Sequence, residues 1–312
     1  MSRLSTRNAI AGFLIASLGI SFARFAQARP QAASLSVETT LVVIPVTVTD
    51  GSNRFVLGLE KQNFTLFEDG VEQQLKQFAG EDAPLSVGLL VDTSGSMGAK
   101  LAISREAVAQ FLKTMNKQDE AFLIEFSDRA NLVCGFTSKA EDIDEKLTSV
   151  ESQGLTALLD AVSMGITEMK KAKNPRKALL IISDGGDNNS QYTPEQIKDL
   201  VHEADVQIYA MGVFERLPYI GLTRAEVSGP RLLAQLAEET GGRAFPARSS
   251  SALPSVARRI GIELRNQYVL AYSPSNEQKN GKYRKVEVKL TAPEGLAGLK
   301  ARWRTGYYAP TP

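Results

Sequence analysis

The sequence predicts an α/β fold: a doubly wound, mainly parallel sheet inserted in a small β-sandwich made from the N- and C-terminal strands. Three observations lead to this prediction. From Leu85 onward, short apolar runs alternate with segments of helical periodicity, which is typical of a parallel sheet with helices on both faces. The segments on either side of this region are strand-like. Neither flank carries enough apolar surface to be stable alone, so we expect the two to pair.

The N-terminal β segment, residues 29–81, has two strand signals. Residues 40–49 are apolar on both faces at first, and Pro45 within them indicates an edge strand or a bulge. Asp69-Gly70 then separates two β-rich runs and predicts a hairpin turn.

The central region, residues 85–265, contains the alternation itself. Expected strands cover residues 85–91, 121–126, 131–136, 178–182 and 206–213, and expected helices cover 100–115, 157–169, 232–239 and 253–264. The runs 121–126 and 131–136 are separated by a short polar turn, so we expect a hairpin within the sheet. The remaining strands alternate with helices and should be parallel.

The C-terminal β segment, residues 266–312, offers three further strands, at 267–272, 283–290 and 300–307. We expect it to pair with residues 36–81 and complete the sandwich. The alternative is a pair of separate N- and C-terminal hairpins, each packed on the central region.

The N-terminus has the pattern of a cleaved secretory signal, residues 1–28. Arg3 and Arg7 precede an apolar run at 9–23, and the small residues at 26–28 offer a cleavage site. The run of about 15 residues is shorter than the ~20 that span a bilayer, which favours cleavage over an uncleaved anchor. We therefore expect an exported protein, periplasmic or secreted, with no stable membrane span after cleavage.

Net charge limits the kinds of partner that the chain can bind, and cysteine content limits its disulfides. Residues 1–28 hold three arginines and no acid, so their removal changes the formal net charge from +1 to +1 − 3 = −2. A near-neutral chain argues against nucleic acid as the main partner, because phosphate binding requires a basic field. Cys134 is the only cysteine, which excludes an internal disulfide. We expect it to be a small buried apolar residue.

Oxygen-bearing side chains follow or open three of the expected elements. They are Asp92, Ser94 and Ser96 after the strand at 85–91, Thr156 before a helix, and Asp184 after the strand at 178–182. An open α/β sheet binds ligands where its strands end. Because hard divalent cations prefer oxygen ligands, the pattern predicts a site for Mg²⁺, with Mn²⁺ or Ca²⁺ as alternatives.

The motif Asp92-x-Ser94-x-Ser96, followed by Thr156 and Asp184, resembles the metal-ion-dependent adhesion site of von Willebrand factor A domains. The resemblance covers residues 85–264, and the flanks are similar to a bacterial family of exported von Willebrand-related proteins. It implies a Rossmann-like fold and a Mg²⁺ ion that captures an Asp or Glu carboxylate of a protein partner. Residues that would rim the partner surface are Gly95, Gly185, Asp187 and Asn188.

Two alternatives to an active metal site remain open. Asp92 and Ser94 could cap one helix and Thr156 another, with Asp184 as a turn residue, since these residue types are common caps. Asp160, one turn into its helix, is expected to be a structural acid. The chain could also be a structural or envelope-assembly module whose cation site is vestigial.

The sequence does not indicate an enzyme. The lone His202 lies on an expected surface helix, where we expect an ordinary solvated histidine, far from any nucleophile-elbow sequence. A phosphate-binding loop of the G-x-x-x-x-G-K-[ST] type is absent from the sequence. Asp92-Thr93-Ser94 resembles an aspartate-nucleophile phosphatase, but Ser94 stands where that class needs a second aspartate. A metal-assisted phosphohydrolase is therefore the least favoured hypothesis.

Overall fold

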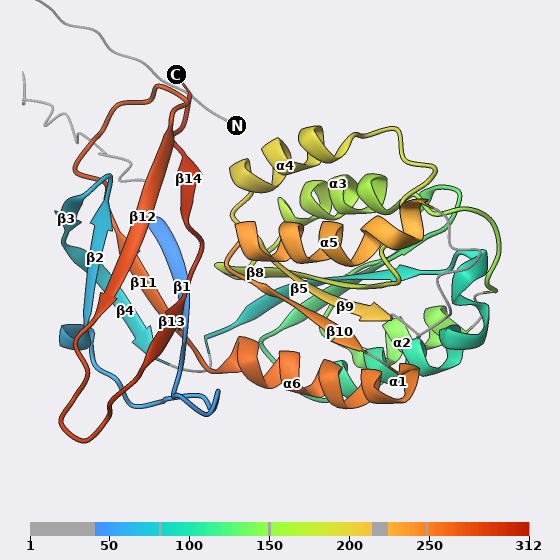
Figure 1. The fold of residues 1–312 in the computed structure, drawn as a ribbon, viewed down its shortest axis with the longest axis horizontal. Coiled ribbons are helices and arrows are strands. Elements are labelled where there is room, and N and C mark those ends of the chain that lie inside the picture. Colours follow the sequence, from blue (N-terminus) through green and yellow to red (C-terminus); the bar gives the residue numbers. More distant parts are fainter. Residues whose placement is uncertain (1–40, 81–82, 149–150, 214–223, 248, 312) are drawn as a thin grey trace, which may run out of the picture. The chain divides into compact units, whose positions relative to one another are not determined.

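The computed structural model describes residues 41–80, 83–148, 151–213, 224–247 and 249–311 (Figure 1). These described residues belong to one compact unit. The predicted signal, residues 1–28, and the start of the N-terminal β segment lie outside the described residues. Within the described ranges, every helix is too short or too polar to span a bilayer.

A six-stranded sheet forms the centre of the α/β region, in the order β10-β9-β8-β5-β6-β7. Its strands are β5 (Leu85–Asp92), β6 (Glu120–Phe126), β7 (Ala130–Thr137), β8 (Arg176–Ser183), β9 (Gln207–Val213) and β10 (Arg243–Ala247). All neighbours are parallel except β6 and β7, which form the predicted hairpin. The mainly parallel sheet is therefore confirmed. The sequence did not predict β10, because Pro246 interrupts a short run; an edge strand tolerates it.

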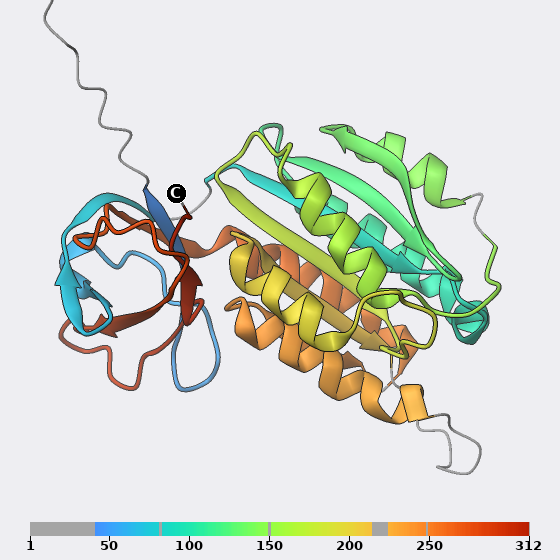
Figure 2. The same ribbon diagram turned by 90° about the horizontal axis from the view of Figure 1, so that it is seen from above.

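Helices cover both faces of this sheet (Figures 1 and 2). They are α1 (Leu101–Leu112), α2 (Ala140–Thr148), α3 (Leu158–Met169), α4 (Pro194–Glu203), α5 (Arg224–Glu239) and α6 (Leu253–Arg265), with 3₁₀ turns η1 (Lys61–Asn63), η2 (Gly95–Lys100) and η3 (Ser250–Ala252). One apolar core joins the sheet to α1, α2 and α6, and a second joins it to α3, α4 and α5. The sheet is thus doubly wound, as predicted.

Two helices differ from the sequence prediction. The helix α2 was not predicted because only Ile143 and Leu147 on it are buried, too few to show helical periodicity. The helix α5 begins at Arg224 rather than at residue 232 and continues through Pro230. Proline usually ends a helix, which is why the prediction started later.

Eight strands build a β-sandwich from both ends of the chain. They are β1 (Val42–Thr49), β2 (Phe64–Glu68), β3 (Val71–Gln73), β4 (Leu75–Gly80), β11 (Gln267–Tyr272), β12 (Tyr283–Leu290), β13 (Lys300–Arg302) and β14 (Gly306–Tyr308). One sheet has the order β13-β1-β11-β4 and the other β14-β12-β2-β3. Each therefore mixes strands from before and after the α/β region, around one shared apolar core. The alternative of separate terminal hairpins is wrong.

Pro45 occupies a local edge of the sandwich. The strand β1 pairs with β11 over most of its length, including Pro45 opposite Val269. On its other side β1 pairs with β13 only at Thr47–Thr49. Pro45 therefore lies where β13 does not reach, in agreement with the edge position that its missing N–H predicts.

The environments of His202 and Cys134 differ from expectation. The His202 side chain is only 15% exposed, with Nε2 3.5 Å from Glu239 Oε2. Its ring packs edge-on against Tyr283 and Tyr308 of the sandwich, so the prediction of a solvated histidine is wrong. Cys134 is half-buried against the core, and burial raises the pKa of its thiol.

A buried carboxylate organises the sandwich interior. Glu68 Oε2 accepts hydrogen bonds from the hydroxyls of Tyr272 and Tyr307, both at 2.7 Å, and Oε1 accepts one from Arg284 at 3.2 Å. Burial raises the pKa of Tyr307 to about 12 and that of Tyr272 still further. Both phenols thus remain donors, and the Glu68 oxygens link strands of the two sheets.

Replacement of Glu68 should weaken the sandwich strongly. Glu68→Ala leaves two buried tyrosine hydroxyls without their acceptor and the buried Arg284 guanidinium without its carboxylate partner, so we expect the free energy of unfolding to fall by about 3–5 kcal/mol. Denaturant titration followed by the fluorescence of Trp303, the only tryptophan, measures the loss. The control Glu72→Ala removes an exposed acid and should change the free energy by less than about 0.5 kcal/mol. Equal effects of the two substitutions would contradict this role for Glu68.

Candidate metal site

The predicted oxygen ligands lie at the carboxyl end of the central sheet, between β5 and β8. These neighbouring strands are parallel, and Val91 pairs with Ile182 just before both strands end. The chain leaves the carboxyl end of β5 through α1 on one face of the sheet and leaves that of β8 through α4 on the other. The strand order therefore reverses here, and such a switch point is where open α/β sheets hold their ligands.

Asp92 is a fully buried carboxylate at the end of β5. Its Oδ1 accepts a hydrogen bond from the Ser94 backbone N–H at 2.9 Å, and its Oδ2 accepts one from Ser183 Oγ at 2.5 Å. Burial raises the pKa of Asp92 to about 6, although the hydrogen bonds from Ser183 and Ser94 partly oppose the increase. A cation beside this carboxylate would offset the loss of solvent around its charge.

Ser94 and Ser96 present paired hydroxyls next to Asp92. Their Oγ atoms are 3.1 Å apart. Neighbouring ligands of an octahedral Mg²⁺, with bonds of 2.0–2.1 Å, are about 3 Å apart, so this spacing fits two adjacent coordination positions. Ser94 is buried and Ser96 is exposed, so the pair leads from the interior to the surface.

Asp184 lies in the loop after β8 and is also buried. Its Oδ1 accepts a hydrogen bond from Gly186 N–H at 3.4 Å, and its Oδ2 is 3.5 Å from Lys100 Nζ. The preceding Ser183 connects this loop to Asp92, because its hydroxyl accepts from Gly185 N–H at 2.9 Å and donates to Asp92. The Asp184 charge also contributes to the raised pKa of Asp92.

The segment that contains Thr156 is hydrogen-bonded to the Asp92 loop. Gly95 N–H donates to Gly154 O at 3.0 Å, and Gln153 N–H donates to Thr93 O at 2.9 Å. Ser152 Oγ donates to the Ser94 carbonyl. Thr156 itself is buried, with 4% of its surface exposed. The structure thus brings the three predicted segments to one end of the sheet.

Asn188 and Asp187, the two polar residues expected at the rim, form hydrogen bonds with Thr156 and with α3. Asn188 Oδ1 accepts from Thr156 N–H at 2.8 Å, and Asn188 N–H donates to Thr156 O at 3.0 Å. Asp187 Oδ1 accepts from Leu159 N–H at 3.3 Å, in the first turn of α3. Gly95 is exposed, whereas Gly185 is buried in a turn with φ of 78°.

Helix capping does not account for the hydroxyl residues. The N-cap of α3 is Ala157, one residue after Thr156, and it makes no side-chain cap bond. Ser94 precedes η2 and makes no side-chain cap bond either. The capping interpretation of these two residues is therefore wrong. Asp160 accepts hydrogen bonds from Gln191 and Tyr192 N–H and is a structural acid, as expected.

Three residues of the site were not found from sequence. Ser183 bonds Asp92 and could have been noticed as a polar residue that ends an apolar run, directly before Asp184. Lys100 reaches Asp184 only in the folded chain. Gly229 of α5 packs on the Asp184 loop so closely that a Cβ there would be 2.5 Å from the carbonyl carbon of Gly185.

The donor set fits a hard cation held largely by hydroxyl and water oxygens. Within the described ranges, His, Cys, Asp and Glu form no cluster of three or more that could hold a metal. A cation here would therefore depend on Ser94, Ser96 and Thr156 besides the carboxylates of Asp92 and Asp184.

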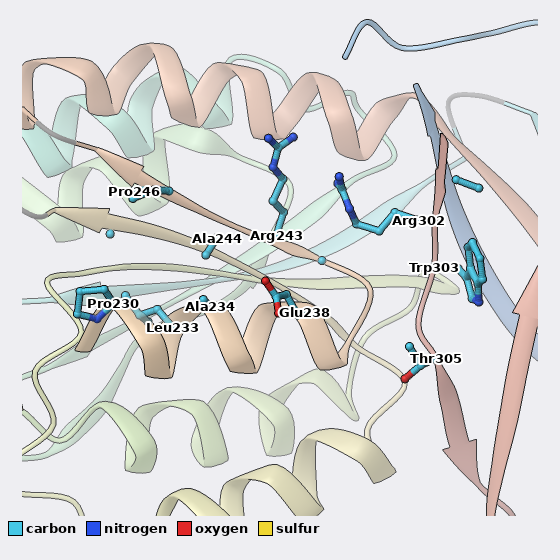
Figure 3. A pocket seen from close by; sticks show the side chains of 13 residues that line it. Pro230, Leu233, Ala234, Glu238, Arg243, Ala244, Pro246, Arg302, Trp303 and Thr305 are labelled. Atoms are coloured by element: carbon cyan, nitrogen blue, oxygen red, sulfur yellow. The ribbon is translucent and has the colours of Figure 1, made fainter. Parts of the chain in front are cut away.

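One cavity lies away from this cluster, and another lies beside it. One, of about 660 Å³, lies between α5, β10 and β13 and is lined mainly by apolar groups such as Leu233 and Trp303 (Figure 3). None of the five predicted ligands lines it. The other, of about 280 Å³, is polar and includes Thr93 of the Asp92 loop and Glu125. Burial raises the pKa of Glu125 to about 7.

The family model of the von Willebrand factor type A domain matches residues 87–186, a range that includes all five predicted ligands. The chain therefore contains a von Willebrand factor type A domain. Domains of this class commonly serve in adhesion or protein interaction.

Curated relatives match part of the chain. The chain is 28% identical over 152 residues to inter-alpha-trypsin inhibitor heavy chain H3 of Pongo abelii. This alignment covers 44% of this chain and 17% of the heavy chain. It is 24% identical over 182 residues to an uncharacterized protein of Borreliella burgdorferi, covering 51% and 53% of the two chains. The chain thus spans less than a fifth of the matched heavy chain.

Solved structures share the fold. A von Willebrand factor type A protein from Catenulispora acidiphila aligns with a TM-score of 0.51 at 12% identity, over 88% of this chain and 75% of that chain. Proximal thread matrix protein 1 from the mussel byssus aligns with a TM-score of 0.50 at 19% identity, over 64% and 51%. The first alignment covers more of the chain than residues 85–265, so it extends into the sandwich.

Gly229→Ala should displace the loop that carries Asp184. The added methyl group would meet backbone atoms of Gly185 at 2.5 Å and of Asp184 at 2.7 Å, neither of which is a flexible side chain. We expect the free energy of unfolding to fall by about 1–3 kcal/mol. Gly135→Ala is the matched control, since a Cβ there meets nothing within 4 Å. Thermal or denaturant unfolding of both variants measures the difference, and equal stability would contradict the close packing of Gly229.

Proposed function

We propose that this protein is an exported binding module that captures a macromolecular partner through a Mg²⁺-dependent site, and that it is not an enzyme. Ser94, Ser96 and Thr156 would surround the metal, Asp92 would bind it or its water, and Asp184 would orient a water ligand. When bound, the metal would supply a positive centre able to attract one more anionic oxygen. The observation that carries this proposal is the 3.1 Å hydroxyl pair of Ser94 and Ser96 beside buried Asp92.

The chemistry of the ligands supports a carboxylate as the partner group. Hydroxyls are neutral, so three of the five proposed ligands would leave the cation able to attract one more anionic oxygen. An Asp or Glu side chain of a partner protein would supply that oxygen. Exposed Ser96 and Gly95 give the site access to a partner.

A partner protein would also cover an exposed apolar side chain beside the site. Leu155, adjacent to Thr156, is 49% exposed, although it is a large apolar residue. Such a side chain next to a charged centre would be covered when a protein surface docks. The match to a domain class that commonly serves in adhesion or protein interaction supports the same conclusion.

Export is part of this proposal and rests on the sequence of residues 1–28. Their basic start, apolar run and small residues fit a secretory signal. A single half-buried cysteine is compatible with folding outside a reducing compartment. Periplasmic and secreted locations both agree with the pattern.

One observation favours the second candidate, an assembly module with a vestigial site. Lys100 already supplies Asp184 with a positive partner inside the chain. A carboxylate so paired can remain folded without a divalent ion. In that case binding would use the sandwich and would not depend on metal.

Loss of Asp92 should abolish metal-dependent capture. We expect a pull-down from the native envelope to recover a partner in Mg²⁺ but not in chelator, and Asp92→Ala to remove the Mg²⁺-dependent fraction, because a buried carboxylate of the proposed site is lost. The bound fraction with and without Mg²⁺ is the measurement. Glu72→Ala, which removes an exposed acid of the sandwich, should bind as the unmodified protein does.

The two candidates give opposite results in this experiment. Capture that is equal in Mg²⁺ and in chelator, and equal in the Asp92 variant, would support the vestigial site and contradict the metal-dependent one. Hydrolysis of a generic phosphoester by the purified protein would instead revive the phosphohydrolase hypothesis.

A further inference from the structure

Lys100 is a positively charged residue that contacts the proposed metal site but is not part of the predicted motif. It is the last residue of η2, and its Nζ is 3.5 Å from Asp184 Oδ2. Both side chains are largely buried, at 12% and 10% exposure. An ion pair so shielded from solvent is stronger than one on an open surface.

The position of Lys100 is unfavourable for a cation apart from this contact. Lys100 is the N-cap of α1, and the first turn of α1 contains no acidic residue. A positive charge at a helix N-terminus is repelled by the helix dipole. The Asp184 carboxylate is therefore the group that stabilises the Lys100 ammonium at this end of the helix.

We propose that Lys100 is a tethered cation that competes with the divalent ion for Asp184 and thereby sets the metal affinity of the module. The inference rests on the metal site of the proposed function. Asp184 cannot give its full charge to both cations, so the ammonium must yield part of its contact when a divalent ion is held nearby. Lys100 thus raises the divalent concentration at which the site fills.

The same charge favours an anionic partner once the metal is held. Asp92 and Asp184 together carry two negative charges, which a divalent ion balances. The Lys100 ammonium, 3.5 Å from Asp184, leaves the assembly with a net charge of about +1. The N-terminus of α1 adds positive potential at the same place. Lys100 therefore weakens metal binding and strengthens attraction for one carboxylate.

Calorimetry with the metal alone tests the inference without any partner. MgCl₂, and separately MnCl₂, is titrated into the unmodified protein and into Lys100→Met, which keeps the aliphatic stem and removes the charge. We expect Lys100→Met to bind both ions about tenfold more tightly, because a nearby positive charge is gone. Lys100→Arg, which keeps the charge, should stay within about threefold of the unmodified protein.

Two further variants make the result specific. Lys76→Met removes an exposed lysine of β4 and should leave metal affinity unchanged, which separates a local effect from one of net charge. Lys100→Gln is a second neutral variant that retains a hydrogen-bond donor toward Asp184. Circular dichroism and thermal unfolding establish that each variant is folded, and at least one neutral variant is needed for the comparison.

Each outcome is decisive. Tighter binding in a folded neutral variant supports the inference, including the case in which only the neutral variant binds metal measurably. Unchanged or weaker binding in the folded neutral variants, with binding in the unmodified protein, overturns the role of Lys100 and leaves the metal site standing. Absence of metal binding in every folded variant overturns the metal site itself, and the inference with it.

Discussion

The parallel pairing of β5 with β8 is the constraint on which the site depends. It places the ends of the two strands side by side, so that Ser183 can donate to Asp92 and the loop with Asp184 follows at once. Side chains alternate between the two faces of a strand, so a shift of the register by one residue would turn Ser183 to the opposite face and remove this bond. The apolar cores on both faces, which hold the strands in register, are thus also what positions the polar cluster.

Buried hydrogen bonds connect the α/β region to the sandwich that it interrupts. The Arg176 side chain, 1% exposed at the start of β8, donates to Leu264 O and to Gln267 Oε1. Gln267 Nε2 in turn donates to Thr47 Oγ1 and Tyr209 Oη. Strands of both regions therefore share one polar network, and its hydrogen bonds limit the cost of burying these side chains. An insertion held in this way needs no long linker.

The sequence predicted those helices and strands whose apolar pattern is contained in one continuous segment. Apolar runs identified β5 and β8, and the spacing of oxygen-bearing residues identified Asp92 and Asp184 as a possible pair. The rest required tertiary information. The role of Lys100 depends on a contact across 84 positions of the chain, and the burial of His202 depends on tyrosines contributed by the sandwich. The edge strand β10 was missed because Pro246 argues against a strand unless its place at the sheet edge is known.

The proposed function requires one divalent cation held by the Asp92 loop together with Thr156 and Asp184. Anomalous diffraction from crystals grown in MnCl₂ tests it most directly, since Mn²⁺ can take the place of Mg²⁺ and scatters anomalously. We expect a single strong peak within about 2.5 Å of the hydroxyls of Ser94 and Ser96. No peak there at saturating Mn²⁺, or a peak held by other residues, would contradict it.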